Sequence, residues 1–419
     1  MIKRDKFSFV LVVLQILGAF FLVGCNDRID KTPDGKTILA FWHSYNDEEE
    51  VVLREIISEW EKKNQGFTVS AIRIPFSGHE SKIRTALTVE RGPDMARVDW
   101  AFVCELARKH ALVDLGTLGF DSIKDQYLKA PLGTTFIDGK YWGIPDQTTG
   151  LGLFYNKKLF RDAGLDPERT PKTWDEFVEF AKKLTNSEKG TFGFAMENTL
   201  WWTLPFFNTF GAKVISEDGK SCSLNSPEAI KAMEFKAGLF KAHKVEAGAW
   251  RAGSVNPETG FLNGRYAMIL MGPWNLAKYA SSPIEFGVGL IPEGPSGTST
   301  NVGGTDVVIF NSSKYPKESY NFLTFFTSPE SQAKWCKKLN QIPVNLKTYD
   351  LVSFENKHLL VFMEQMKHAL PNPIVTKSNI LEKIVNPEME AVLTGQKSAE
   401  DAFRLAARKV EETILKSKP

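Results

Sequence analysis

Tryptophan and polar side chains stand next to each other at several points of the sequence, and together they can bind a sugar. A sugar has hydroxyl groups around its rim and C–H groups on its ring faces, so its site needs flat aromatic rings beside carboxylate, amide or imidazole groups. The chain contains 10 Trp and 30 Phe, and several of the Trp lie in stretches rich in Gly, Pro and Asn, where a core residue is less expected. The candidate binding residues are Trp42, His43, Asp99, Trp100, Asp146, Gln147, Trp202, Trp250 and Trp274.

The first of these candidates follow expected strands, at the carboxyl ends where wound α/β sheets place their ligands. Trp42 and Trp100 can equally be core residues of a lobe. Trp201 and Trp202 begin an aromatic helix. Adjacent side chains of a helix point about 100° apart, so one of the pair is expected to face a ligand while the other packs. The sequence does not tell which of them does.

Two further tryptophans lie in loops. Trp250 is in a polar segment and is the weaker candidate. Trp274 follows Gly272 and Pro273, which are expected to form a turn after an apolar strand and to present the next side chain outward. Trp274 is therefore the strongest candidate for stacking on a pyranose ring.

Motifs of the common enzyme classes are absent from the sequence. It contains no G-x-S-x-G elbow, no G-x-x-x-x-G-K-[ST] loop, no H-E-x-x-H pair and no complete dinucleotide-binding glycine loop. The 6 His are scattered without the spacing of metal ligands, so neither a metal nor a cofactor is expected. An exported glycosidase stays open as the alternative to a non-catalytic receptor, because its two carboxylates can come from anywhere in the chain.

The N-terminus predicts export and lipidation. Residues 3–6 carry three basic side chains and one acidic one, residues 9–23 are apolar except for Gln15, and the sequence then reads Leu22-Val23-Gly24-Cys25. A basic segment, a short apolar stretch and a small residue before the break are typical of a secretory signal. The ending resembles the bacterial lipobox, so residues 1–24 are expected to be removed and Cys25 to carry a lipid. Residues 25–36 are expected to form a tether, and an uncleaved N-terminal anchor is the alternative.

The charge of the chain excludes several partners. The sequence has 52 Lys and Arg against 50 Asp and Glu, and removing Lys3, Arg4, Lys6 and Asp5 with the leader leaves 49 of each. A balanced chain has no sequence-wide field for a phosphate backbone or an anionic bilayer. No nucleic acid partner is therefore expected, the membrane is expected to be reached through the N-terminal lipid alone, and we expect a monomer.

Three cysteines follow the lipobox, at positions 104, 222 and 336. An odd count without C-x-x-C spacing excludes a dense disulfide framework and a zinc cluster. Buried free thiols are the favoured interpretation of Cys104 and Cys336, which lie in helical patterns. One disulfide is the alternative.

The pattern of apolar residues predicts an α/β fold with two lobes. The 419 residues exceed what one hydrophobic core usually supports. Strand and helix patterns alternate along the first part of the folded chain, which favours a mostly parallel, wound sheet. The expected strands there cover residues 37–42, 67–74 and 93–98, and the expected helices cover residues 47–63, 81–89 and 102–109.

The segment from residue 139 to residue 156 departs from this alternation. Two apolar runs, residues 141–144 and 151–155, flank Pro-Asp-Gln-Thr-Thr-Gly, which is expected to link the lobes. Helix starts follow at Ser226 and Ser328, each succeeded by Pro, and at a capping box of Thr173 with Glu176. Further strands are expected at residues 266–271, 286–291 and 307–310, a flexible loop at 294–304 and a final helix at 398–416.

Several motifs are spread along the chain from residue 92 to residue 332, and the resemblance that they carry covers nearly the whole mature chain. The most specific is F-x-x-G-R-Y-A-M at residues 261–268, which continues to M-G-P-W at residues 271–274. G-P-D at 92–94, G-I-P at 143–145, F-G-V-G-L-I-P at 286–292, G-G at 303–304 and F-L-T-F-F-T-S-P-E-S-Q at 322–332 stand in the same order as in a known family. On these motifs the sequence resembles the bacterial extracellular solute-binding proteins of the maltose-binding type, the receptor components of ABC sugar importers.

The resemblance implies two wound α/β lobes joined by a hinge that the chain crosses more than once, with the ligand in the cleft between them. Crossings are expected near residues 146–150 and 291–295. The first lobe would then hold residues 37–147 and 293–345, and the second would hold residues 148–292 and 346–419.

The resemblance also implies roles for the candidate residues. The aromatic platform falls on Trp274, the first-strand contact on Trp42 or His43, the strand-end carboxylate on Asp99 and the hinge-side contacts on Asp146 or Gln147. Many family members have an aromatic residue directly after the Gly-Gly pair. This chain has Thr305 and Asp306 there, so Asp306 joins the binding candidates and the site is expected to be polar at that point.

The expected function is that of a lipid-anchored receptor that binds a sugar or oligosaccharide and delivers it to the permease of an ABC importer. The identity of the sugar is not transferable from the family. A receptor of the same fold for a non-sugar solute, such as a phosphate ester, is the alternative within the family, although clustered basic residues are not evident in the segments named.

Overall fold

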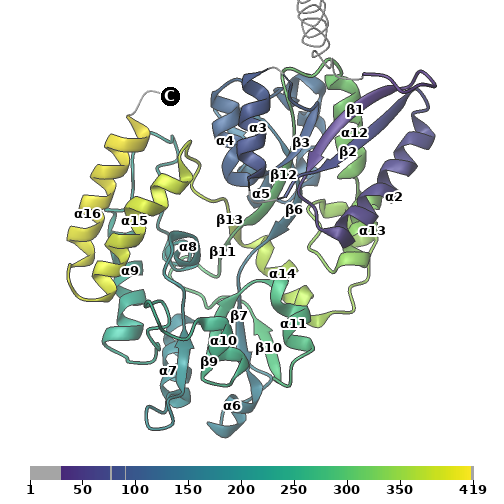
Figure 1. Ribbon diagram of the computed structural model, residues 1–419. Helices are drawn as coiled ribbons and strands as arrows, with labels where there is room; N and C mark the ends of the chain where they lie inside the picture. The colour runs from purple at the N-terminus through teal and green to yellow at the C-terminus, as the bar shows by residue number, and fades with distance from the viewer. Residues whose placement is uncertain (1–29, 76–77, 90, 417–419) are drawn as a thin grey trace, which may run out of the picture.

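The computed structural model of the protein describes residues 30–75, 78–89 and 91–416. Its strands form two main sheets, each in its own lobe (Figure 1). The leader and Cys25 lie outside the described residues. Within the described part, no helix combines the length and the apolar composition that a membrane crossing requires.

The first lobe contains a five-stranded sheet in the order β2-β1-β3-β12-β6. β1 pairs in parallel with β2 and β3, whereas β12 runs antiparallel to both β3 and β6. The predicted alternation of strand and helix is confirmed for the first three strands. The strands are β1 (Thr37–His43), β2 (Phe67–Arg73), β3 (Met95–Asp99), β6 (Ile144–Thr149) and β12 (Gly303–Ile309). The helices are α2 (Asp47–Lys63), α3 (His79–Thr88), α4 (Trp100–Arg108), α5 (Lys129–Gly133), α12 (Pro316–Phe326) and α13 (Pro329–Leu339).

Helices cover both faces of this sheet because both faces of its strands are apolar. On one face, Trp60 of α2, Phe322 of α12 and Trp335 of α13 belong to one buried cluster. On the other face, Ile83 of α3 and Phe102 of α4 pack against the strands. α2 begins at a reciprocal capping box of Asn46 and Glu49, which satisfies two backbone donors of its first turn.

The second lobe contains a four-stranded sheet in the order β10-β7-β9-β8, in which β7 and β9 are antiparallel and β8 and β9 are parallel. Its strands are β7 (Gly152–Asn156), β8 (Phe192–Ala195), β9 (Tyr266–Met271) and β10 (Phe286–Gly289). Its helices are α6 (Lys157–Asp162), α7 (Trp174–Leu184), α8 (Leu200–Thr209), α9 (Pro227–Lys241), α10 (Pro257–Leu262), α11 (Leu276–Ala280), α14 (Lys357–Lys367), α15 (Ser378–Leu393) and α16 (Ala399–Val410).

The aromatic-rich core of the second lobe joins α7, α8 and α9 to the C-terminal pair α15 and α16. Trp174 stacks on Phe206 with ring centroids 4.9 Å apart, and Phe403 of α16 contacts Phe207 of α8 edge-on. Ser226 and Ser328 cap their helices as predicted. Thr173 caps α7, but Glu176 accepts from Lys172 rather than from the cap, so the predicted capping box is only half formed.

The chain passes between the sheets more than once. β6 belongs to the first sheet and β7, which begins shortly after it, to the second; β10 belongs to the second sheet and β12 to the first. The sheet membership of these strands supports a first crossing near residues 146–150. The second crossing lies later than the predicted residues 291–295, because Glu293 still pairs with Lys172 and Trp174 of the second lobe and the chain rejoins the first sheet at β12. The lobe limits predicted above, residues 37–147 with 293–345 and residues 148–292 with 346–419, stay a proposal.

Two details of the crossings correct the sequence interpretation. The segment predicted as a link is strand β6, because residues 144–149 pair with β12. Part of the predicted loop at 294–304 is β11 (Thr300–Asn301), which pairs with β13 (Ala369–Leu370) between the lobes. The two crossings pack closely: a Cβ on Gly150 would lie 2.9 Å from the Met366 sulfur and 3.1 Å from the carbonyl oxygen of Asn301, so a larger residue there would displace its neighbours.

All three described cysteines, Cys104, Cys222 and Cys336, are buried and free, which confirms the favoured interpretation over a disulfide.

The remaining short elements connect these parts. The short elements are a hairpin of β4 (Phe136–Ile137) and β5 (Lys140–Tyr141), the single turns η1 (Leu115–Leu118), η2 (Phe120–Ser122), η3 (Lys124–Gln126), η4 (Pro273–Asn275) and η5 (Leu346–Asp350), and a terminal π-turn, η6 (Glu411–Leu415).

Candidate functional site

Three indole rings gather on the side of the second lobe that faces the crossings. Trp201 and Trp202 come from the first turn of α8, and Trp274 comes from η4 directly after β9. The ring centroids of Trp201 and Trp202 are 5.2 Å apart, and Trp274 lies 6.2 Å from Trp201 and 6.3 Å from Trp202. Trp274 is 49% exposed, the largest exposure among the aromatic side chains of this cluster. The three rings form a continuous aromatic surface, called the tryptophan cluster below.

Local sequence explains the position of Trp274. Its ring folds back over Gly272, where a Cβ would lie 1.8 Å from the ring, so a larger residue before this turn would force the ring to move. The side chain therefore does not project freely from the turn, as the sequence suggested, but lies along the surface with one part of the ring open to solvent.

Trp201 connects the cluster to the chain between the lobes. Its indole Nε1 donates a hydrogen bond of 3.2 Å to the carbonyl oxygen of Val302, which lies between β11 and β12. A Cβ on Gly303 would be 3.3 Å from the Trp201 ring. The side chain of Trp201 is thus fixed by the second crossing itself.

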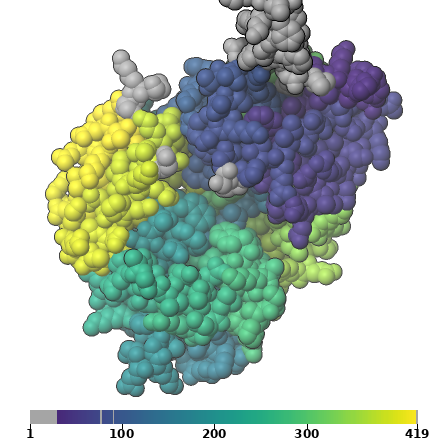
Figure 2. All heavy atoms as spheres, in the orientation of Figure 1, coloured from purple at the N-terminus to yellow at the C-terminus, as the bar shows by residue number. Residues whose placement is uncertain are grey.

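A cavity of about 200 Å³ next to the tryptophan cluster is lined by residues of both lobes. Trp100, the first residue of α4, lines it from the first lobe, and Trp201 lines it from the second. In Figure 2 the C-terminal helices, drawn in yellow, lie against atoms of both lobes. The other lining residues are Ala101, Leu200, Leu204, Pro373, Ser378, Leu381 and Glu382. Two aromatic rings and a carboxylate from different elements therefore share one cavity.

Asp99 lies directly before Trp100 and holds the start of α4. Its carboxylate accepts from the backbone N–H of Ala101 at 2.9 Å, as the helix cap. Burial raises the pKa of Asp99 to about 6. Trp42 is half-buried in the core between β1 and α3, with the Lys82 ammonium 5.3 Å from its ring centroid. Asp99 adjoins the cavity, whereas Trp42 is not among the residues that line it.

Asp146 and Gln147 belong to a buried polar network inside the first lobe. Asp146 accepts from the Tyr45 hydroxyl at 2.6 Å and from Arg97 Nε at 3.2 Å. Gln147 accepts from the same guanidinium and donates to Glu49 at 3.1 Å. The Arg97 guanidinium also lies 4.3 Å from the ring centroid of Tyr45. The network uses these two predicted side chains to tie β6 to β3 and α2.

His43 and Asp306 are also interior residues. The ring of His43 is fully buried, its Nδ1 accepts from the backbone N–H of Tyr45 at 3.3 Å, and burial lowers its pKa to about 4. Asp306 is buried on β12 and one of its carboxylate oxygens has no hydrogen-bond partner among the described residues. Burial, and after it the charge of Asp146, raises the pKa of Asp306 well above its usual range. With a pKa of about 4, His43 is a neutral side chain of the core at neutral pH.

Trp250 has its own partners in the loop after α9. Its Nε1 donates to Glu246 at 3.1 Å, and its ring lies edge-on to Phe240 with centroids 5.6 Å apart. Glu246 is buried and also accepts from the backbone N–H groups of Met196, Gly248 and Ala249. Trp250 therefore packs within its own loop, against Glu246 and Phe240, and is not among the residues that line the cavity with Trp201.

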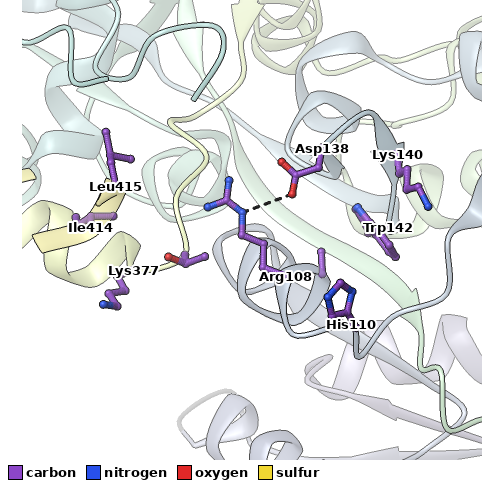
Figure 3. A pocket seen from close by; sticks show the side chains of 10 residues that line it. Arg108, His110, Asp138, Lys140, Trp142, Lys377, Ile414 and Leu415 are labelled. Carbon is purple, nitrogen blue, oxygen red and sulfur yellow. Dashed lines mark ion pairs between the residues drawn. The ribbon is translucent and has the colours of Figure 1, made fainter. Parts of the chain in front are cut away.

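A second and larger cavity, about 480 Å³, lies between the end of α4 and the C-terminal π-turn. Figure 3 shows Arg108, His110, Lys140 and Trp142 on one side of it and Lys377, Ile414 and Leu415 on the other. Arg108 is paired with Asp138 across 3.7 Å. None of the sequence-predicted binding residues lines this cavity. Among the described residues there is also no group of three His, Cys, Asp or Glu side chains arranged to hold a metal ion.

Sequence reasoning left Trp201 unresolved against Trp202, and the structure assigns both to the cluster. It missed Lys236 of α9, which is fully buried beneath the first turn of α8. A signal was available, because Lys236 occupies an apolar stripe with Ala229, Met233 and Phe240 at helical spacing. It also missed Arg97. The partners of its guanidinium, Asp146 and Gln147, lie far from it in the sequence, and the residues around position 97 do not indicate that they will be close.

The fold and this arrangement define a class: a two-lobed binding protein with aromatic side chains from both lobes at the crossings. The model of the bacterial extracellular solute-binding protein family matches residues 46–333. The chain therefore belongs to this family, which confirms the resemblance seen in the sequence.

Known proteins agree with this assignment. The crystal structure of a cyclic alpha-maltosyl-1,6-maltose binding protein from Arthrobacter globiformis has a TM-score of 0.83 and 25% identity, covering 91% of this chain and 100% of that one. The sugar-binding protein MalE from Xanthomonas citri has a TM-score of 0.80 and 24% identity, covering 90% and 97%. The sn-glycerol-3-phosphate-binding periplasmic protein UgpB of Salmonella paratyphi A is 24% identical over 413 residues, covering 90% of this chain and 92% of the relative.

Proposed function

We propose that the protein is an exported receptor that binds a sugar or oligosaccharide between its lobes and delivers it to the permease of an ABC importer. The observation that carries the proposal is the cavity between Trp100 and Trp201, next to Trp202 and Trp274. Aromatic rings approaching from two lobes suit the two apolar faces of a pyranose ring. Family membership and the sugar-binding neighbours support the same ligand class.

The charge of the cavity favours a sugar over a phosphate ester. A phosphate group requires Arg or Lys donors, and in the described lining of this cavity the charged side chain is Glu382. A carboxylate accepts hydrogen bonds from hydroxyl groups and repels a phosphate. Glycerol 3-phosphate, which the Salmonella relative binds, is thus the second candidate and not the first.

The proposal includes attachment to the membrane. Leu22-Val23-Gly24-Cys25 supports a lipid on Cys25 and removal of residues 1–24. A lipid anchor keeps a monomeric receptor close to its permease, and the polar residues 25–36 supply the tether. The protein carries out no reaction on its ligand in this proposal.

A thermal-shift screen of the mature chain against a panel of mono- and oligosaccharides tests the function. A ligand at about 100 times its Kd is expected to add roughly 2.7 kcal/mol to the free energy of unfolding. Glycerol 3-phosphate belongs in the panel, because stabilisation by that compound alone would replace the sugar with the second candidate.

Trp274→Ala then tests the aromatic platform. Loss of a stacked ring costs on the order of 1–3 kcal/mol by analogy with base stacking, which corresponds to a Kd weakened about tenfold or more. Because Trp274 is 49% exposed, the melting temperature without ligand is expected to change little. Phe136→Ala, at a ring of 43% exposure on β4, is the control and is expected to keep the wild-type Kd.

A further inference from the structure

Lys236 is a buried lysine that the proposed binding site does not explain. It lies on α9 with no exposed surface, between the apolar residues Met233 and Ala237. Its ammonium donates to the side-chain oxygen of Asn198 at 2.8 Å and to the hydroxyl of Thr203 at 2.6 Å. Both acceptors are neutral groups, so these hydrogen bonds supply no opposite charge.

The two acceptors stand on either side of the tryptophan pair. Asn198 precedes α8 and Thr203 ends its first turn, with Trp201 and Trp202 between them. The Thr203 hydroxyl also donates to the carbonyl oxygen of Thr199 at 2.8 Å, so the ammonium and the hydroxyl together close this turn.

The first turn of α8 lacks the usual local support. Thr199, its cap residue, makes no side-chain hydrogen bond to the helix. The backbone N–H of Leu200 instead donates to Asn386 of α15 at 2.8 Å. The turn that carries two rings of the tryptophan cluster is therefore held from distant elements, and Lys236 binds it on both sides of the pair.

A buried ammonium that is hydrogen-bonded to neutral groups is costly for folding. Burial lowers the pKa of Lys236 to about 7, and Glu246 and Glu197 are the carboxylates that oppose this effect. An apolar side chain of similar length would fill the same space without desolvating an ammonium. A stability role alone therefore does not account for a lysine at this position.

We infer that Lys236 is a positioning residue of the ligand site: it fixes the first turn of α8 and so sets the orientation of Trp201 toward the cavity and of Trp202 within the tryptophan cluster. The inference rests on the proposed function for its effect on binding, but its effect on the two rings is independent of any ligand. Stacking is sensitive to small displacements, because a gap of about 0.5–1 Å already forfeits a quarter to a half of a dispersion contact.

The test uses the mature chain with Lys236→Met, and Lys231→Met as the matched control at an exposed position of the same helix. Near-ultraviolet circular dichroism of the tryptophans reports the orientation of the rings, and calorimetric titration with the sugar found in the screen reports Kd. For Lys236→Met we expect an altered tryptophan signal and a Kd weakened about tenfold, equivalent to about 1.4 kcal/mol, with no fall in melting temperature at pH 6. The control is expected to match the wild type in all three.

Thr203→Val and Thr203→Ser keep the inference falsifiable if Lys236→Met fails to fold. The Val variant removes the acceptor at nearly constant shape and should reproduce the changed dichroism and Kd, whereas the Ser variant should restore both. Wild-type dichroism and Kd in both Lys236→Met and Thr203→Val would overturn the inference. If the wild type binds no sugar, the proposed function fails, and the dichroism alone still decides the role of Lys236.

Discussion

The buried ammonium of Lys236 makes the stability of the protein depend on pH in a way that one substitution isolates. The pKa of this group is about 7 in the folded protein and 10.5 as the ordinary value. Between these values the unfolded chain binds more protons than the folded one, so stability rises as pH rises from about 7 to about 10.5 and is lost as pH falls through that range. Lys236→Met removes this dependence, while the other titrating groups stay in both proteins.

The magnitude follows from the difference between the two pKa values. A shift from 10.5 to about 7 corresponds to roughly 5 kcal/mol at pH 6 and to about 2 kcal/mol at pH 9, since each unit is worth about 1.4 kcal/mol. Loss of the hydrogen bonds to Asn198 and Thr203 offsets about 2–3 kcal/mol of this at every pH. Lys236→Met is therefore expected to be about 2 kcal/mol more stable than the wild type at pH 6 and close to it at pH 9.

Urea denaturation of both proteins at intervals from pH 6 to pH 9 measures the difference, with Lys231→Met as a control that should show no slope. Glu246 and Glu197, the carboxylates whose charges act on Lys236, are present in both proteins. The charge of Lys236 also lowers the pKa of Glu197, so the comparison measures Lys236 together with this coupling. A difference in unfolding free energy that stays constant across the window would refute the reasoning, because it would mean that Lys236 carries its ordinary pKa in the folded state.

Further predictions concern other parts of the molecule. Trp100→Ala is expected to weaken sugar binding about tenfold, measured by calorimetry; a larger effect of Trp42→Ala would show that the wall of the first lobe had been assigned to the wrong tryptophan. Asp306→Asn is expected to gain melting temperature relative to the wild type as pH rises above the ordinary pKa of 3.8, because burial raises the pKa of Asp306 in the fold and the wild type therefore loses stability as its unfolded chain ionises. A difference in melting temperature that does not change with pH would contradict the raised pKa. Mass spectrometry of the native protein is expected to find a lipid-modified Cys25 as the first residue, and an intact Met1 would rule out the leader.

The fold could be predicted from the sequence where short-range patterns, such as apolar runs and helix caps, agree with the strand pairing of the folded protein. The first three strands each combine an apolar run with a following amphipathic helix, and the caps at Ser226 and Ser328 act within one helix turn. The segment at 144–149 was not readable in the same way. Its Pro, Asp, Gln and Thr residues are typical of a link, and it becomes a strand only because β12, far along the chain, pairs with it.

The candidate site was predictable in part for the same reason. Trp274 and Trp100 are candidates in the sequence because a turn or a strand end lies next to them. In the sequence Asp146 is a candidate for binding a ligand because its partner Arg97 lies on another strand, and no residue near position 146 indicates that a guanidinium will pair with it. Lys236 lies in the apolar stripe of α9, but its role cannot be predicted from that helix. Its acceptors, Asn198 and Thr203, lie more than thirty residues earlier in the chain.

The tryptophan cluster is coupled to the hinge by direct contacts. The carbonyl oxygen of Val302, between β11 and β12, accepts from Trp201 and from the side-chain amide of Asn372. Gly303 lies so close to Thr149 of β6 that a Cβ would be 2.8 Å from its methyl group. A rotation of one lobe against the other about these crossings is expected to strain or break the bond that holds the Trp201 ring. A ligand that stacked on Trp201 would therefore touch the ring that is bonded to the second crossing, and a rotation that broke the Trp201–Val302 hydrogen bond would change the shape of the proposed site.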